Sequence, residues 1–169
     1  MRRLPWLVPL VTFCVLALTR TGDAGRIDST SWNLAGSHKS KIGRSKPVKT
    51  VISDGSLLVG LGVFTAANLP TAYTGTYADK GRRGFTATTD APGTQSLTDY
   101  FVDRIKTSTG ASAVDVLSIA VKITGVVSKD GSVLRAKTKI TLKGTITILG
   151  FQRPGKVTDT GRFRGTQPG

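Results

Sequence analysis

Hydrophobic and polar residues alternate along most of the chain, and the alternation is clearest between Ser132 and Lys143. Mostly apolar side chains occupy the even positions of this stretch. The positions between them carry Arg135, Lys137, Lys139 and Lys143. Because successive side chains of a strand point to opposite faces, the pattern predicts a strand with one buried and one basic face.

The stretch before it, residues 113–127, is also predicted to be a long strand with an apolar face. Asp130-Gly131 is placed to turn the chain between the two strands, since glycine tolerates the positive φ of a tight hairpin. Taken together, the two strands predict an inward-facing set that could line a lumen. Its members are Leu117, Ile119, Val121, Leu134, Ile140 and Leu142.

The remaining strands are shorter, and turn signals separate them. Asp54-Gly55 and Pro154-Gly155 are predicted to be turns, Gly144 a break between strands, and residues 64–72 a loop. The pattern gives nine strand segments, which would form about eight strands. Besides the two long ones, they are predicted over residues 32–41, 48–53, 57–63, 74–78, 84–89, 145–149 and 156–166.

One helix is predicted, over residues 96–107. Ser96 with Asp99 resembles a capping box, and Gly110 is placed to end the helix. Side chains at helical spacing form an apolar face, which consists of Leu97, Phe101 and Ile105. We expect the helix to lie against the strands rather than to act as a mobile lid.

These elements predict an all-β domain over residues 31–167. Sequential antiparallel strands with one apolar face can close into a roughly eight-stranded barrel with one short helix, and closure removes exposed edges. A β-sandwich would satisfy the same pattern, so it is the alternative.

Three segments resemble the lipocalin-like (calycin-type) barrels: Trp32 on the first strand, the hairpin between Thr74 and Asp90, and the closing residues 161–165. The resemblance implies that Trp32 packs under Arg164 or Arg162 and supports the barrel architecture more than any function. Two features depart from the family. Thr30 stands where lipocalins have a glycine, and the predicted helix comes in the middle of the chain.

The N-terminal residues have the composition of a signal peptide. Arg2 and Arg3 precede an apolar run over residues 4–18, and the small residues Gly22 and Ala24 follow. The run is about 15 residues long, short of the ~20 that span a membrane. We therefore expect cleavage after residue 24, a polar lead-in over residues 25–30, and a secreted or periplasmic protein without an integral membrane span. Cleavage would also remove Cys14, the only cysteine.

Charge is the strongest compositional signal. The chain has 24 Lys and Arg residues and only 10 acids, all of them Asp, for a net charge of +14. Such an excess favours anionic partners, although it can also serve solubility alone. The candidate anion-binding residues are Arg135, Lys137, Lys139, Lys143, Arg162 and Arg164.

Catalytic motifs are missing from the sequence. His38 is the only histidine, which excludes a multi-histidine metal site, and we expect it to be a solvent-exposed residue at a strand end. Asp99 and Asp103 sit at helical spacing and are expected to be solvated. No Gly-x-Ser-x-Gly motif occurs. We therefore expect a protein that is not an enzyme and uses no metal or cofactor.

Two functions fit these observations. The protein could bind a small apolar ligand in its lumen, or it could be a structural or adhesive module that docks on anionic lipid, lipopolysaccharide or cell-wall polymer. Nucleic acid is the weaker partner, because aromatic residues make up only 7% of the chain and none alternates with the basic row.

Overall fold

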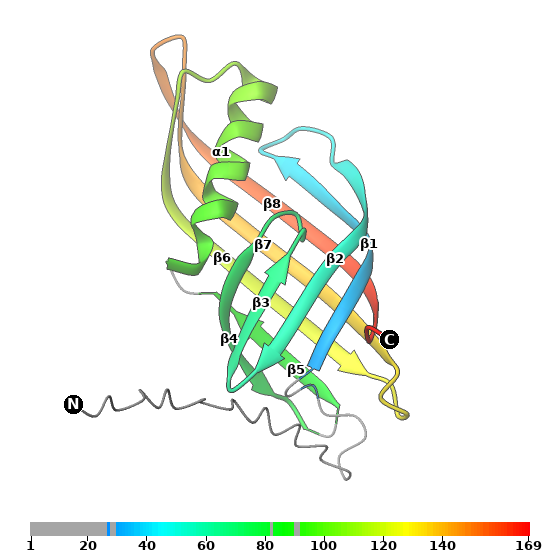
Figure 1. Cartoon of the computed structure of the whole chain (residues 1–169). Helices are drawn as coiled ribbons and strands as arrows, with labels where there is room; N and C mark the ends of the chain where they lie inside the picture. Colours follow the sequence, from blue (N-terminus) through cyan, green and yellow to red (C-terminus); the bar gives the residue numbers. More distant parts are fainter. Residues whose placement is uncertain (1–26, 28–29, 82, 90–91) are drawn as a thin grey trace, which may run out of the picture.

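The computed structural model describes residues 27, 30–81, 83–89 and 92–169. In this part of the chain, eight antiparallel strands follow one another round a closed barrel, and the last pairs with the first (Figure 1). The predicted all-β barrel is therefore confirmed, and the sandwich alternative is wrong. The strands are β1 (Thr30–Ile42), β2 (Val48–Gly60), β3 (Val63–Ala67), β4 (Tyr73–Asp79), β5 (Gly84–Thr88), β6 (Ala113–Val127), β7 (Val133–Ile148) and β8 (Phe151–Thr166).

A closed eight-stranded meander is compatible with the lipocalin-like barrel that the sequence resembles. The helix lies between β5 and β6, in the middle of the chain, and in this the protein differs from that family. The predicted signal peptide, residues 1–24, lies outside the described residues.

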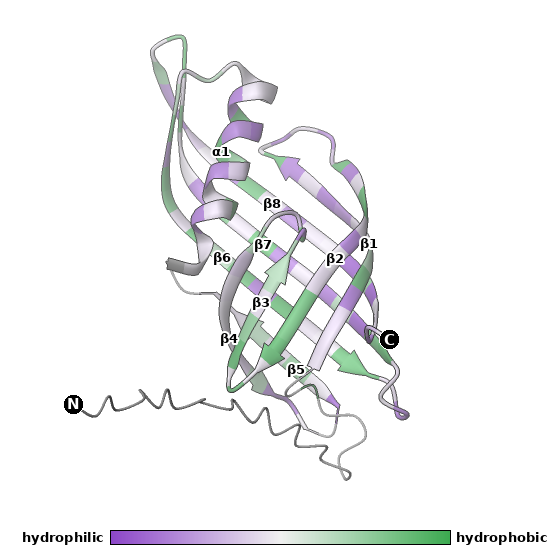
Figure 2. Ribbon diagram, in the orientation of Figure 1, coloured by the Kyte–Doolittle hydropathy of each residue, from purple (hydrophilic) through white to green (hydrophobic). Residues whose placement is uncertain are grey.

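The alternation in β7 has the predicted effect. Leu134, Ile140 and Leu142 are buried, whereas Arg135 and Lys137 on the opposite face are exposed. Figure 2 shows the same change of hydropathy along the long strands. The core is thus the barrel interior, and the cations lie on its outer wall.

The predicted turn at Asp130-Gly131 joins β6 and β7. Asp130 accepts hydrogen bonds from the Ser128 hydroxyl and from the Ser132 backbone N–H and hydroxyl, the last at 2.7 Å. These donors, Ser128 first, lower the pKa of Asp130 to about 2. The carboxylate therefore keeps its charge, and with it the turn's hydrogen bonds, at neutral pH.

The predicted turn at Asp54-Gly55 is wrong, because both residues lie within the continuous strand β2. Gly55 pairs with Leu34, and a Cβ placed on Gly55 would lie 2.7 Å from the Leu69 Cδ2 atom. The glycine thus permits a close approach inside the barrel. The chain turns instead at Leu61-Gly62, where φ is 53° and 79°, and β3 then occupies part of the predicted loop.

The break predicted at Gly144 and the turn predicted at Pro154-Gly155 are also wrong. Gly144 and Gly155 pair with each other inside the continuous strands β7 and β8. A Cβ on Gly144 would lie 2.2 Å from the Asp115 carbonyl oxygen, so this glycine also permits a close approach between neighbouring strands. The turn lies at Leu149-Gly150, where φ is again positive at both residues.

Helix α1 (Gln95–Thr109) follows a 3-10 turn (Pro92–Thr94) and buries its predicted apolar face of Leu97, Phe101 and Ile105. It contacts β4, β6 and β7 and lies beside the upper part of the barrel in Figure 1. Gly110 ends it with φ 69°, as predicted. The capping box is wrong, because Ser96 lies within the helix and the N-cap is Thr94, whose side chain makes no capping hydrogen bond to the helix.

Candidate functional site

A buried histidine–carboxylate pair lies inside the barrel. His38 on β1 and Asp159 on β8 are 2% and 0% exposed, and the His38 Nδ1 and Asp159 Oδ2 atoms are 2.6 Å apart. The prediction of a solvent-exposed His38 is therefore wrong. Lys39 and Lys41 take the outward positions of β1, so His38 and Ser40 share the inward face with Trp32.

Several polar atoms of this pair and of nearby side chains have no hydrogen-bond partner. Among the described buried side chains, they include His38 Nε2, Asp159 Oδ1, Ser40 Oγ and the Tyr73 hydroxyl. Ser40 is directly opposite Asp159 in the β1–β8 ladder, and the Asp159 charge also acts on Tyr73. Because most buried polar groups in proteins have a partner, this gathering is a candidate binding site.

The site offers both donors and acceptors. Burial, and then the charge of Asp159, raise the pKa of Tyr73 above its ordinary value, so its hydroxyl stays protonated and can donate. A carboxylate at Nδ1 orients the His38 ring and leaves Nε2 for a second interaction. The described residues contain no group of three metal-ligating side chains. The arrangement is thus suited to hydrogen bonding with a small polar group.

A pocket of about 510 Å³ lies between α1 and the β1–β2 hairpin, and Ser40 is the one of these polar residues that lines it. Its lining includes Ser40, which faces inward and is 3% exposed, and Val48, which is 54% exposed. From α1, Tyr100 and Arg104 contribute, with Arg104 Nη1 donating to the Tyr100 hydroxyl at 2.8 Å. We call this the mouth pocket, lined by Ser40, Ile42, Val48, Tyr100, Asp103 and Arg104 together with polar residues at its rim.

Five of the six predicted lumen residues face the barrel interior, and one faces outward. Val121, Leu134, Ile140 and Leu142 are buried in the barrel core, and Ile119 is half-buried. Leu117 is 77% exposed on the outer wall, so its predicted inward position is wrong. The cause is a β-bulge, since the β6–β7 register shifts between Val116 and Ser118 and reverses the faces. None of the six lines the mouth pocket.

Trp32 is fully buried, but its predicted arginine partner is wrong. The Trp32 Nε1–H donates to Thr30 Oγ1 at 2.8 Å. Arg162 and Arg164 are both exposed on the outer face of β8. The inward residue beside Trp32 and Leu34 is Gly165, where a Cβ would lie only 2.6 Å from the Leu34 Cδ2 atom.

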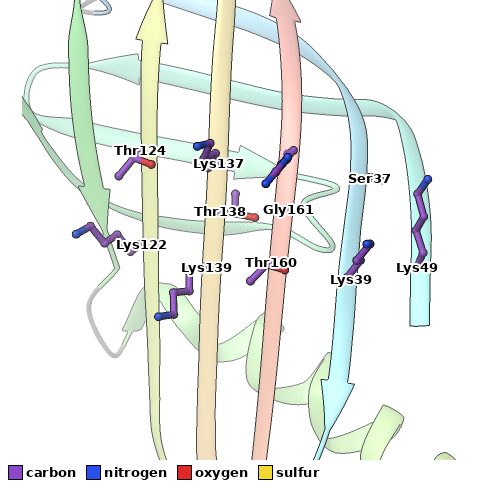
Figure 3. A pocket seen from close by; sticks show the side chains of 11 residues that line it. Ser37, Lys39, Lys49, Lys122, Thr124, Lys137, Thr138, Lys139, Thr160 and Gly161 are labelled. Carbon is purple, nitrogen blue, oxygen red and sulfur yellow. The ribbon is translucent and has the colours of Figure 1, made fainter. Parts of the chain in front are cut away.

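The outer wall has a second hollow, of about 780 Å³, across β6, β7, β8, β1 and β2 (Figure 3). Two rows of side chains follow the strand pairing across it. One row consists of Lys122, Lys139, Thr160, Lys39 and Lys49, and the other of Thr124, Lys137, Arg162 and Ser37. We call this hollow the cationic groove.

The cationic groove brings together only half of the predicted anion-binding residues. Lys137, Lys139 and Arg162 line it. Arg135 and Arg164 instead line a separate hollow beside the β6–β7 turn, and Lys143 lines neither. Lys39 and Lys49 were missed, because only the closed barrel shows that β1 and β2 continue the surface of β7 and β8.

Cations face one another in the groove without acids between them. Lys39 pairs with Lys49, Lys122 with Lys139, and Lys137 with Arg162. In the described part of the chain, no carboxylate lies within salt-bridge distance of these six cations. Like charges directly opposite each other destabilise a sheet.

Comparison with protein-family models, with curated proteins and with solved structures finds no match to this chain. A search of the described helices for one long and apolar enough to cross a membrane also finds none.

Proposed function

We propose that this protein is an exported, non-enzymatic binding barrel that holds one small, mainly apolar molecule in the mouth pocket. The observation that carries the proposal is the unpartnered Ser40 hydroxyl in the pocket lining, directly opposite Asp159. A ligand hydroxyl or amide at this point could pair with the Ser40 hydroxyl. Each buried polar group left unpaired costs about 1–3 kcal/mol, so pairing it favours binding.

The walls of the mouth pocket suit an apolar body. Ile42, Val48 and Tyr100 supply carbon surface, and the half-exposed Val48 has area left to bury. Burying such a side chain stabilises a complex by about 1 kcal/mol at ~25 cal/mol per Å². The volume of about 510 Å³ lies within the usual range of small-molecule sites.

Two sequence features support the export part of the proposal. The basic and apolar N-terminal segment is typical of a signal peptide, and the only cysteine lies within it. Protein recovered from the medium or periplasm should then begin near Gly25. An intact mass that includes residues 1–24 would count against export.

The ligand proposal can be tested with N-phenyl-1-naphthylamine, a neutral apolar fluorophore with one N–H donor. Its fluorescence should rise on binding, with little dependence on salt because the probe has no charge. Val48→Asp should weaken binding at least tenfold, since it places a charge on the apolar wall. Val51→Asp is the matched control, because Val51 is 72% exposed on the outer face of the same strand.

Ser40→Ala tests the polar end of the pocket. Loss of one hydrogen bond should lower probe affinity about fivefold, the equivalent of roughly 1 kcal/mol. Equal binding by the parent, Val48→Asp and Val51→Asp would show that the probe sits elsewhere and would refute the proposal.

A further inference from the structure

We propose that the cationic groove binds one extended anionic polymer chain with a phosphate group in each repeat. The six cations concerned are Lys39, Lys49, Lys122, Lys137, Lys139 and Arg162. This site is on the outer wall and independent of the mouth pocket, with which it shares no lining residue.

The spacing of the cations suits a linear chain of charges. Lys122 and Lys139 are direct neighbours on β6 and β7, so their Cβ atoms are about 5 Å apart. Thr160 on β8 separates Lys139 from Lys39, which gives about 10 Å. The row then ends at Lys49 on β2. A polymer lying across the strands would meet a cation at nearly every strand.

The second row adds width to the path. Lys137 and Arg162 lie two residues along their strands from Lys139 and Thr160, or about 7 Å. Between the cations, the Ser37, Thr124 and Thr160 hydroxyls line the same hollow. Hydroxyls can donate hydrogen bonds to phosphate oxygens, so each phosphate could meet both a charge and a donor.

Electrostatics gives the groove its affinity for anions. Three like-charged pairs face each other across the strands, and among the described residues no carboxylate lies close enough to offset them, so an anion from outside the chain would relieve their mutual repulsion. A hollow lined by one sign of charge concentrates the field and attracts the opposite charge. These features explain why the partner should be polyanionic.

The lining also indicates which kind of polyanion fits. Every residue that lines the groove is polar or glycine. A surface that inserts into a membrane usually presents apolar or aromatic side chains, and one that binds nucleic acid usually presents aromatic rings for stacking on bases. The groove has neither, which favours a chain of phosphates without bases or acyl tails at the contact.

The test uses long-chain inorganic polyphosphate and titration calorimetry at two salt concentrations. The parent protein should bind the polymer more tightly at low salt, because binding releases counterions. The triple variant Lys39→Gln, Lys122→Gln, Lys139→Gln should lose at least tenfold in affinity and show a weaker salt dependence. Circular dichroism should show an unchanged fold, since all three side chains are exposed.

A matched control removes the same charge elsewhere. Lys106, Lys129 and Arg153 are exposed and do not line the groove. Their joint replacement by Gln should change polyphosphate affinity by no more than about threefold, through long-range attraction alone. Equal losses in the two triple variants would overturn the proposal, because net charge would then explain the binding.

Two other probes decide the class of partner. Vesicles of phosphatidylglycerol and a single-stranded DNA oligonucleotide should each bind more weakly than polyphosphate of equal charge concentration. Stronger binding of either, lost in the groove variant, would assign the groove to a membrane or a nucleic acid and overturn the polymer proposal. N-phenyl-1-naphthylamine binding should be the same in the parent and the groove variant, which separates this test from that of the mouth pocket.

Discussion

The interior of the barrel differs between the two halves of β1. Around Trp32 the inward face is mainly apolar, with Leu34 next on the same face and Leu57 directly opposite, all three buried. Around His38, six residues further along the same inward face, the barrel holds a buried histidine–carboxylate pair and several polar atoms without partners.

The difference shows how one strand can serve two purposes. Close packing of large apolar side chains gives the Trp32 region its stability. The His38 region retains polar groups whose burial costs free energy unless they are paired. Buried polar groups without partners are an exception to how a core is normally packed, and such exceptions are expected at functional sites. Substitutions in the two regions should therefore have different effects on stability.

The largest effect is expected in the apolar region. Trp32→Ala should lower the free energy of unfolding by about 3–5 kcal/mol, because it leaves a large cavity in a fully buried position. Urea denaturation measures the change. Leu58→Ala is the control, since Leu58 is 57% exposed next to the buried Leu57, and it should cost under about 0.5 kcal/mol. Similar losses in both variants would contradict the assignment of Trp32 to the core.

In the polar region, breaking the contact between His38 and Asp159 should lower the free energy of unfolding by less than Trp32→Ala does. Asp159→Ala should lower the free energy of unfolding by about 2–3 kcal/mol, because it leaves His38 buried without its partner. Replacing both residues by Leu should recover most of this loss, since two apolar groups need no partner. A double variant less stable than Asp159→Ala would show that the pair itself stabilises the fold.

The sequence predicted most of the barrel because alternation is a local signal. The faces of β7 follow from every second residue between Leu134 and Leu142. The turn predicted at Gly55 and the break predicted at Gly144 were wrong, because a turn and a close approach between strands both favour a residue without a side chain. The bulge that exposes Leu117 has no signature of its own in the sequence.

The site was less predictable because it depends on contacts between distant residues. Counting alternate positions from Trp32 would have placed His38 and Ser40 on the inward face, so this signal was present. The partner of His38 lies 121 residues away, and only closure of β1 on β8 brings Asp159 to it. The same closure joins Lys39 to Lys139 across Thr160, which no local pattern reveals.

The smallest effect at neutral pH, and a distinct one at high pH, is expected for Tyr73→Phe. The Tyr73 hydroxyl has no hydrogen-bond partner, so its removal should change the free energy of unfolding by less than about 1 kcal/mol near pH 7. Urea denaturation at a series of pH values, from neutral to alkaline, measures this contribution.

In the folded protein, burial and the charge of Asp159 raise the pKa of Tyr73 above its ordinary value of 10.0. Below that pH the phenol is protonated in both the folded and the unfolded state, so its contribution to stability is fully present. As the pH rises further, the unfolded chain releases this proton first, and stability falls by up to ~1.4 kcal/mol per pH unit. The parent should therefore lose stability more steeply than Tyr73→Phe above about pH 10. Thr74→Ala, an exposed neighbour on the outer face, should keep the parent's slope. Equal slopes in the parent and Tyr73→Phe would mean that Tyr73 ionises freely in the folded protein, and that the region around Asp159 is open to water.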